Sequence, residues 1–159
     1  MKNYSTMILR LAIILAAFIV LAICGGAAWQ AINMNPSSDY LILSHVLLAG
    51  TCLAAVPCYI ALYQSYKLLG YIDAGSVFSD LSVKALKLIM RSAFVEFLIC
   101  TLGGLPFFYV LAEKEDAPGL VVIGMAIAGV AFVIFVFASV LNRLLHDAIA
   151  LKSENDLTI

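Results

Sequence analysis

One carboxylate stands apart from the other acidic residues of this chain because it lies in an apolar stretch. Glu96 is the only charged residue between positions 92 and 112. A carboxylate inside a membrane is costly, so we expect it to face neighbouring helices or a water-filled crevice, where it finds a partner or stays protonated. Its candidate partners are Arg91, Arg10, Arg143, Tyr59 and Tyr63. Glu96 is therefore either the centre of a proton- or cation-coupled site or one half of a structural pair that orients the helices.

The two histidines do not have the spacing of a metal site. His45 falls near one end of an apolar segment and His146 near the C-terminus, and neither has a second histidine or an acid at ligand spacing. Asp147 directly follows His146, but sequence neighbours on a helix point in different directions. We therefore expect His45 to be a buried, hydrogen-bonded polar residue of its helix and not a metal ligand.

The cysteines and the other nucleophiles also form no recognisable catalytic motif. The four cysteines, at positions 24, 52, 58 and 100, have neither CxxC spacing nor a neighbouring histidine. We expect them to pack as small apolar residues and not to form a zinc site or a disulfide framework. The sequence contains no nucleophile elbow, HExxH, Gly-rich phosphate loop or paired-aspartate motif. We therefore predict a protein that is not an enzyme and that holds no cofactor and no metal.

The composition indicates that a bilayer surrounds most of the chain. Hydrophobic residues make up 64% of the 159 residues and charged residues only 12%, whereas a soluble domain has roughly 45–50% apolar residues. Residues 11–36, 40–66 and 117–142 contain no charge, and residues 92–112 contain only Glu96. Each stretch is long enough for a helix to cross the hydrocarbon core, which takes roughly 20 residues. Because these runs lack the alternation of barrel strands, they predict four transmembrane helices.

The expected fold is a single all-α domain over residues 1–159, a bundle in which successive helices run up, down, up and down. The helices are expected at about residues 7–32, 40–69, 80–111 and 120–152, with a tail over residues 153–159. Pro57 and Pro106 should kink the second and third helices. Small residues four positions apart, such as Gly124 and Ala128, allow close helix packing, either inside the bundle or in a homo-oligomer.

The basic residues give the expected orientation. All nine lysines and arginines except Lys114 fall before the first span, near the connection between the second and third, or after the fourth. Positive residues accumulate on the cytoplasmic side, so we expect both termini in the cytoplasm. Lys2 and Arg10 ahead of an apolar run imitate a secretory signal, but the run is longer than a signal core and three spans follow it. The net charge of −1 argues against nucleic-acid binding by this chain itself.

The connection between the second and third helices contains a helix start. The Ser79 hydroxyl can accept a hydrogen bond from the backbone N–H of Leu81 or Ser82. Phe78, just before this N-cap, would pack on Val83 across the first turn. Helical spacing continues past the membrane in the second, third and fourth helices, so we expect these three to project into the cytoplasm.

The C-terminus is polar and ends in aliphatic residues. After Lys152, the Ser, Asn and Asp residues favour the end of the helix, and residues 157–159 can be extended. Peptide-binding grooves capture a free carboxylate in that form, although a frayed and solvated terminus is the simpler alternative. The candidate partner-binding residues are Phe78, Ser79, Glu154, Asn155, Asp156, Leu157, Thr158 and Ile159.

Two segments, GSVFSDLSVKALKLI after the second helix and ALKSENDLTI at the C-terminus, resemble a family of uncharacterised bacterial four-helix membrane proteins. Members of that family end in a similar tail, and the similarity spans essentially the whole chain. Their genes often adjoin one for a small Cro-type helix-turn-helix regulator. The resemblance therefore implies a multi-pass protein of the bacterial cell membrane that holds such a regulator on its cytoplasmic side. The residues of this chain that match the segments shared by the family are Gly75, Phe78, Ser79 and residues 154–159.

The sequence supports two hypotheses about function. The first is a non-enzymatic membrane protein whose cytoplasmic base and tail dock or sequester a small helix-turn-helix regulator. The second is a small transporter, channel or bacteriocin-immunity protein built around Glu96. The first depends on the tail, and the second depends on the buried carboxylate.

Overall fold

The computed structural model describes residues 2–33 and 40–156, and every regular element in these ranges is a helix. Helix α1 covers Lys2–Asn33 and α2 covers Leu41–Asp73. The third run consists of α3 (Asp80–Ile99), the π-helix η1 (Cys100–Gly104) and α4 (Leu105–Glu115), and α5 covers Gly119–Asp156. The four runs Thr6–Asn33, Leu41–Asp73, Asp80–Glu115 and Gly119–Lys152 are long and apolar enough to cross a membrane. The prediction of four long apolar helices is confirmed.

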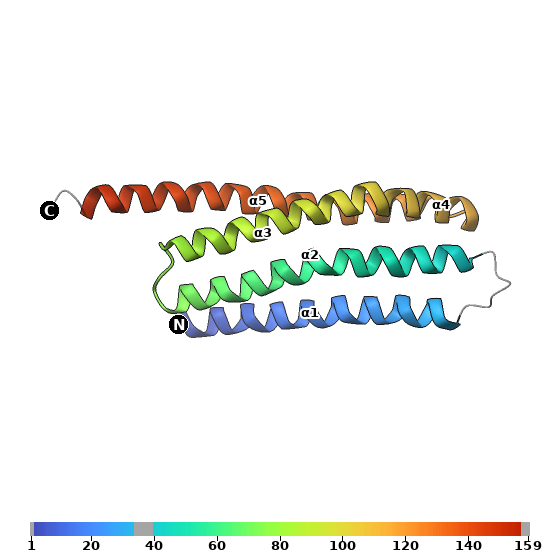
Figure 1. Ribbon diagram of the computed structural model, residues 1–159, viewed down its shortest axis with the longest axis horizontal. Coiled ribbons are helices and arrows are strands. Elements are labelled where there is room, and N and C mark those ends of the chain that lie inside the picture. Colours follow the sequence, from blue (N-terminus) through green and yellow to red (C-terminus); the bar gives the residue numbers. More distant parts are fainter. Residues whose placement is uncertain (1, 34–39, 157–159) are drawn as a thin grey trace.

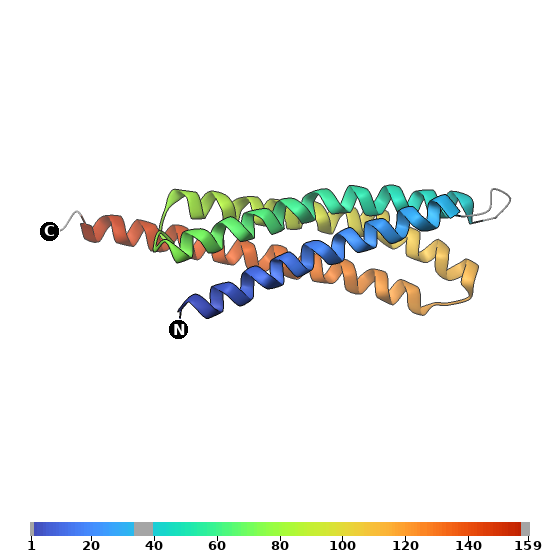
Figure 2. The same ribbon diagram turned by 90° about the horizontal axis from the view of Figure 1, so that it is seen from below.

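The four runs lie next to one another in chain order, and successive runs point in opposite directions (Figure 1). Helix α1 packs on α2, α2 packs on α3, and α3 and α4 pack on α5. Within the described residues α1 and α5 share no extensive contact, and they form the two edges of the row in Figure 1. The arrangement therefore differs from a closed bundle, in which the first and last helices would also meet. Figure 2 shows α1 inclined to α5.

Aromatic and small side chains join α3 and α4 to α5. Phe94 lies against Phe135 with ring centroids 5.1 Å apart, and Phe97 lies against Phe132 at 5.3 Å. Further along, the ring of Phe108 fits against Gly124, where a Cβ atom would lie 2.8 Å from Cδ2 of the ring. Such close approach is typical of membrane helices, whose association depends on packing and not on hydrophobic burial.

The third run is interrupted where the sequence predicted one helix. Its turn at Cys100–Gly104 is a π-helix, in which the Leu105 N–H donates to the Cys100 carbonyl oxygen. Pro106 directly follows, and it has no N–H with which to complete the α-helical pattern. The change of hydrogen-bond register is therefore the local response to Pro106. Helix α2, by contrast, continues through Pro57 without interruption.

The helices extend further than the residue patterns indicated. Helix α1 begins at Lys2 and not near residue 7, and α2 continues through Gly70 to Asp73. Helix α5 continues past Lys152 to Asp156, so the predicted helix end at that lysine is wrong. Ser, Asn and Asp each cost only about 0.7 kcal/mol or less in a helix, and one Gly costs about 1 kcal/mol. Penalties of this size do not end a helix that is already formed.

Candidate partner-binding face and buried polar residues

The start of α1, the α2–α3 connection and the end of α5 lie at one end of the molecule (Figure 1). We call this the basic end, because the lysines and arginines other than Lys114 lie on the parts of the chain nearest to it. The opposite end carries the connection between α4 and α5, with Glu113, Glu115 and Asp116. The predicted partner-binding residues that the structure describes, Phe78, Ser79, Glu154, Asn155 and Asp156, belong to chain segments at the basic end.

Helix α3 begins at the basic end with the predicted N-cap. The backbone N–H of Ser82 donates to the Ser79 Oγ at 3.3 Å. The Ser82 hydroxyl in turn donates to the Ser76 carbonyl oxygen at 3.3 Å, and Ser82 is 0% exposed. Gly75 takes a positive φ of 71° in the turn before it. Ser79 is thus held by the helix start, and its hydroxyl has a structural task.

Phe78 differs from the serine that follows it. It lies in the connection between α2 and α3, and 53% of its surface is exposed. The predicted contact with Val83 would therefore leave about half of the ring uncovered. Of the two candidates in this connection, Phe78 is the one whose side chain remains open to another molecule.

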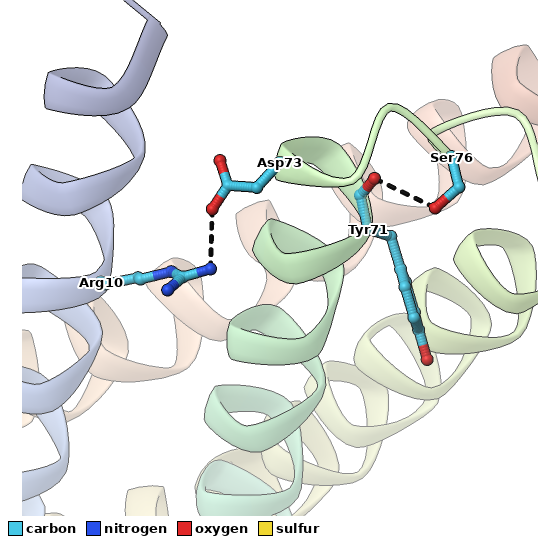
Figure 3. A network of polar contacts seen from close by, with 4 residues as sticks. All are labelled: Arg10, Tyr71, Asp73 and Ser76. Atoms are coloured by element: carbon cyan, nitrogen blue, oxygen red, sulfur yellow. Dashed lines mark hydrogen bonds and ion pairs between the residues drawn. The ribbon is translucent and has the colours of Figure 1, made fainter.

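An ion pair joins α1 to α2 at the basic end (Figure 3). Arg10 Nη2 donates to Asp73 Oδ2 at 2.7 Å, and the Arg10 guanidinium carbon lies 5.4 Å from the ring centroid of Tyr66. Both charged side chains are about one-third exposed, so the pair contributes at most about 1 kcal/mol. Next to this ion pair, residues 9–16 of α1 and residues 62–72 of α2 line a groove of about 440 Å³.

The end of α5 presents apolar residues on two different faces. Leu145 packs on the cluster of Leu86, Ile89 and Ala138. Leu144 and Leu151 point away from the protein, with 58% and 68% of their surfaces exposed. The leucines at the end of α5 are thus divided between an inward face and an outward face.

The structure places only part of the predicted tail. Glu154 is exposed on the last turn of α5, and Asn155 and Asp156 belong to the same helix. The predicted end of the helix before these residues is therefore wrong. Leu157, Thr158 and Ile159 lie outside the described residues.

Glu96 lies in α3 one turn before the π-helix. Its Oε1 accepts a hydrogen bond from Cys100 Sγ at 3.8 Å, a long contact to a weak donor. Its Oε2 is buried and has no hydrogen-bond partner in the part of the chain that the structure describes. The spacing of four residues between Glu96 and Cys100 could have identified this contact from the sequence. The arrangement leaves one carboxylate oxygen able to hold a proton or a cation.

Arg91 and His45 are exposed, so their prediction as buried polar residues is wrong. Arg91 precedes Glu96 by five positions, which places the two about 140° apart around an α-helix. His45 Nδ1 lies 2.8 Å from the Leu41 carbonyl oxygen, so one ring nitrogen contacts the backbone of its own helix. No metal-binding group of three or more His, Cys, Asp or Glu side chains occurs within residues 2–33 and 40–156.

Three other expected partners of Glu96, namely Arg10, Tyr59 and Tyr63, make different contacts. Arg10 binds Asp73, as described above. The Tyr59 hydroxyl donates to the Ala17 carbonyl oxygen at 3.0 Å, which joins α2 to α1. Lys67 Nζ lies 4.7 Å from the ring centroid of Tyr63. The contacts of Arg10 and Tyr59 depend on the register between α1 and α2, which the sequence of either helix alone does not contain.

The model of a family described as "Protein of unknown function (DUF2975)" matches residues 4–159. The chain is 42% identical over 163 residues to the "Uncharacterized membrane protein YoaS" of Bacillus subtilis (strain 168), and the alignment covers 100% of both chains. No solved structure matches.

Proposed function

The chain belongs to the DUF2975 family of membrane proteins, and from this premise we propose that it is a non-enzymatic docking protein. In this proposal both termini lie in the cytoplasm, and the basic end holds a small helix-turn-helix transcriptional regulator at the membrane. The kind of partner comes from the resemblance described above. The exposed residues of the basic end support this end of the molecule as the place where the regulator docks.

The observation that carries the proposal is the projecting part of α5. Leu145 is the last of its leucines that packs on α3, and the helix continues for about three turns to Asp156. Leu151 on this extension is 68% exposed, and Phe78 of the α2–α3 connection is 53% exposed at the same end. Exposed apolar residues on a helix that leaves the membrane support a protein-binding surface.

The charges support a cytoplasmic position for this surface. Lysines and arginines flank membrane spans mainly on the cytoplasmic side, and all of them except Lys114 lie nearest the basic end. A regulator bound there would be withdrawn from its DNA sites in proportion to its affinity for the membrane protein. A signal that shifts the basic end to a conformation of lower affinity would release it.

Co-purification tests this proposal. The full chain, a chain that ends at Lys152 and the variant Leu151→Gln are each expressed with the helix-turn-helix protein encoded beside the gene. The full chain should retain the regulator, while truncation and Leu151→Gln should each lower recovery at least fivefold. The matched control is Ala150→Gln, because Ala150 is exposed next to Leu151 but on another face of the helix.

The outcomes separate the parts of the proposal. Equal recovery with the full and truncated chains would remove the tail from the mechanism. Equal recovery with Leu151→Gln and Ala150→Gln would remove the outward face of α5. If the full chain retains no regulator, the proposed partner is wrong.

One observation favours a second candidate function, a small transporter, channel or bacteriocin-immunity protein. The buried Oε2 of Glu96 lies beside the π-helix, and π-helical turns occur frequently at functional sites. In proteoliposomes, Glu96→Gln should abolish a proton or cation flux that the chain truncated after Lys152 retains. The exposed Glu113→Gln is the control, and a flux that survives Glu96→Gln would exclude this function for the carboxylate.

A further inference from the structure

A cavity lies at the end of the molecule opposite the basic end, between α1, α2 and α4. Its volume is about 250 Å³. The residues that line it are Gln30, Tyr40, Leu43, Ser44, Leu47, Phe107, Leu111 and Glu115. They come from three different spans, so the cavity depends on the tertiary arrangement and is not a property of one helix.

The cavity combines an apolar interior with polar groups toward the ends of the helices. The apolar residues Leu43, Leu47 and Phe107 lie within α2 and α4. Glu115 is the last residue of α4, so its carboxylate lies at the helix end. The Ser44 hydroxyl already donates to the Leu41 carbonyl oxygen at 2.8 Å. A ligand would therefore meet apolar groups inside and a carboxylate at the helix end.

The charged residues at this end of the cavity are mainly acidic. Glu115 contributes a carboxylate to the lining, and Glu113 and Asp116 lie next to it in the sequence. Lys114 is the nearest basic residue, and its Nζ lies 5.0 Å from the ring centroid of Tyr40. The Tyr40 ring thus already receives an ammonium group on its face, a geometry in which aromatic rings attract cations.

We propose that this cavity binds a small organic cation that carries an alkyl or aryl group, such as an aryl ammonium compound. The ammonium group would lie between Tyr40 and Glu115, and the apolar group would lie against Leu43, Leu47 and Phe107. The cation would exchange with Lys114 at the Tyr40 ring. This proposal is independent of regulator docking, because its residues lie at the other end of the molecule.

The test uses the purified full chain in a nonionic maltoside detergent, so that no lipid ammonium group is present. Phenyltrimethylammonium is the probe, and its uncharged isostere tert-butylbenzene is the control compound. A ligand that binds the folded state raises the unfolding midpoint with a saturable concentration dependence. We expect such a rise with phenyltrimethylammonium and a smaller rise, without saturation, with tert-butylbenzene.

Two substitutions locate the cation. Glu115→Gln and Tyr40→Leu should each weaken the apparent affinity for phenyltrimethylammonium about threefold, since exposed charge pairs and cation–π contacts are individually modest. Tyr40→Phe, which keeps the ring, and Asp116→Asn, which removes a charge outside the lining, should leave the affinity unchanged. Asn suits Asp116 because this residue has a φ of 49°.

A further variant tests the exchange with the lysine. Lys114→Met should strengthen binding of phenyltrimethylammonium, because it removes the ammonium group that occupies the Tyr40 ring. An equal rise of the unfolding midpoint with phenyltrimethylammonium and with tert-butylbenzene would overturn the proposal. So would an affinity in Glu115→Gln and Tyr40→Leu equal to that of the unsubstituted chain.

Discussion

At the scale of single residues, Gly124 shows how closely the spans approach. A Cβ atom there would lie 2.8 Å from Cδ2 of Phe108, whereas a Cβ atom at Gly129 on the same helix would meet no atom within 4 Å. We expect Gly124→Ala to be less stable than Gly129→Ala by about 1–3 kcal/mol, the usual cost of overpacking. Both variants gain the same helix propensity, so their difference isolates the contact with the ring.

The measurement is the thermal unfolding midpoint of both variants in the same detergent. Phe108→Leu in the Gly124→Ala background should recover part of the loss, because the smaller side chain makes room for the added methyl group. Equal midpoints for Gly124→Ala and Gly129→Ala would show that Phe108 moves aside without cost.

Ser79 allows a second prediction at this scale. Its hydroxyl caps α3 through the Ser82 N–H, so Ser79→Ala should lower the free energy of unfolding by about 1 kcal/mol. Ser79→Asp supplies another capping oxygen and should restore most of it. The same thermal unfolding experiment checks both variants. A similar loss with Ser79→Asp would indicate that the hydroxyl matters for a reason other than capping.

At the scale of elements, the sequence predicted where helices start better than where they change or end. The N-cap at Ser79 could be predicted because it depends only on neighbouring residues, and the structure contains it. The π-helix at Cys100–Gly104 was missed, because Pro106 predicts a disturbance but not how the backbone accommodates it. The continuation of α5 to Asp156 was also missed, because residue propensities of a few tenths of a kcal/mol are easily overridden.

The ion pair that joins α1 to α2 gives a prediction about the association of these two helices. A double-mutant cycle with Arg10→Met and Asp73→Asn should yield a coupling of about 0.2–1 kcal/mol, because both side chains are partly exposed. Thermal unfolding of the two single variants and the double variant gives this value. Raising the salt concentration should reduce it. A coupling near zero at low salt would mean that the pair adds nothing to the association of the two helices.

At the scale of the whole molecule, the orientation can be tested in intact cells. With the four native cysteines replaced by alanine, Glu113→Cys should react with a membrane-impermeant maleimide. Ser76→Cys, at the basic end, should react only after the membrane is permeabilised. These outcomes follow from the distribution of basic residues. The reverse labelling pattern would place both termini outside and remove regulator docking in the cytoplasm.

The sequence was sufficient to predict the number of spans but not which helices meet. Uncharged stretches longer than a bilayer crossing are read from composition alone. Whether Arg10 reaches Glu96 or Asp73 depends on the register between α1 and α2, and whether α1 meets α5 depends on the packing of all four runs. Arg91 and His45 were placed inside for the same reason, since the inner face of a span cannot be identified when nearly all of its residues are apolar.

The position of α1 at the edge of the row gives the bilayer a direct influence on this protein. A helix of 32 residues is about 48 Å long, so it must tilt or extend beyond a hydrocarbon layer of about 30 Å. Among the described residues, helix α1 packs extensively on α2 alone, and the groove of about 440 Å³ between these two helices is apolar. A thinner or thicker bilayer therefore changes the tilt of α1 at lower cost than that of α3, which is held from two sides. Hydrophobic mismatch would thus act first on the helix that carries Arg10.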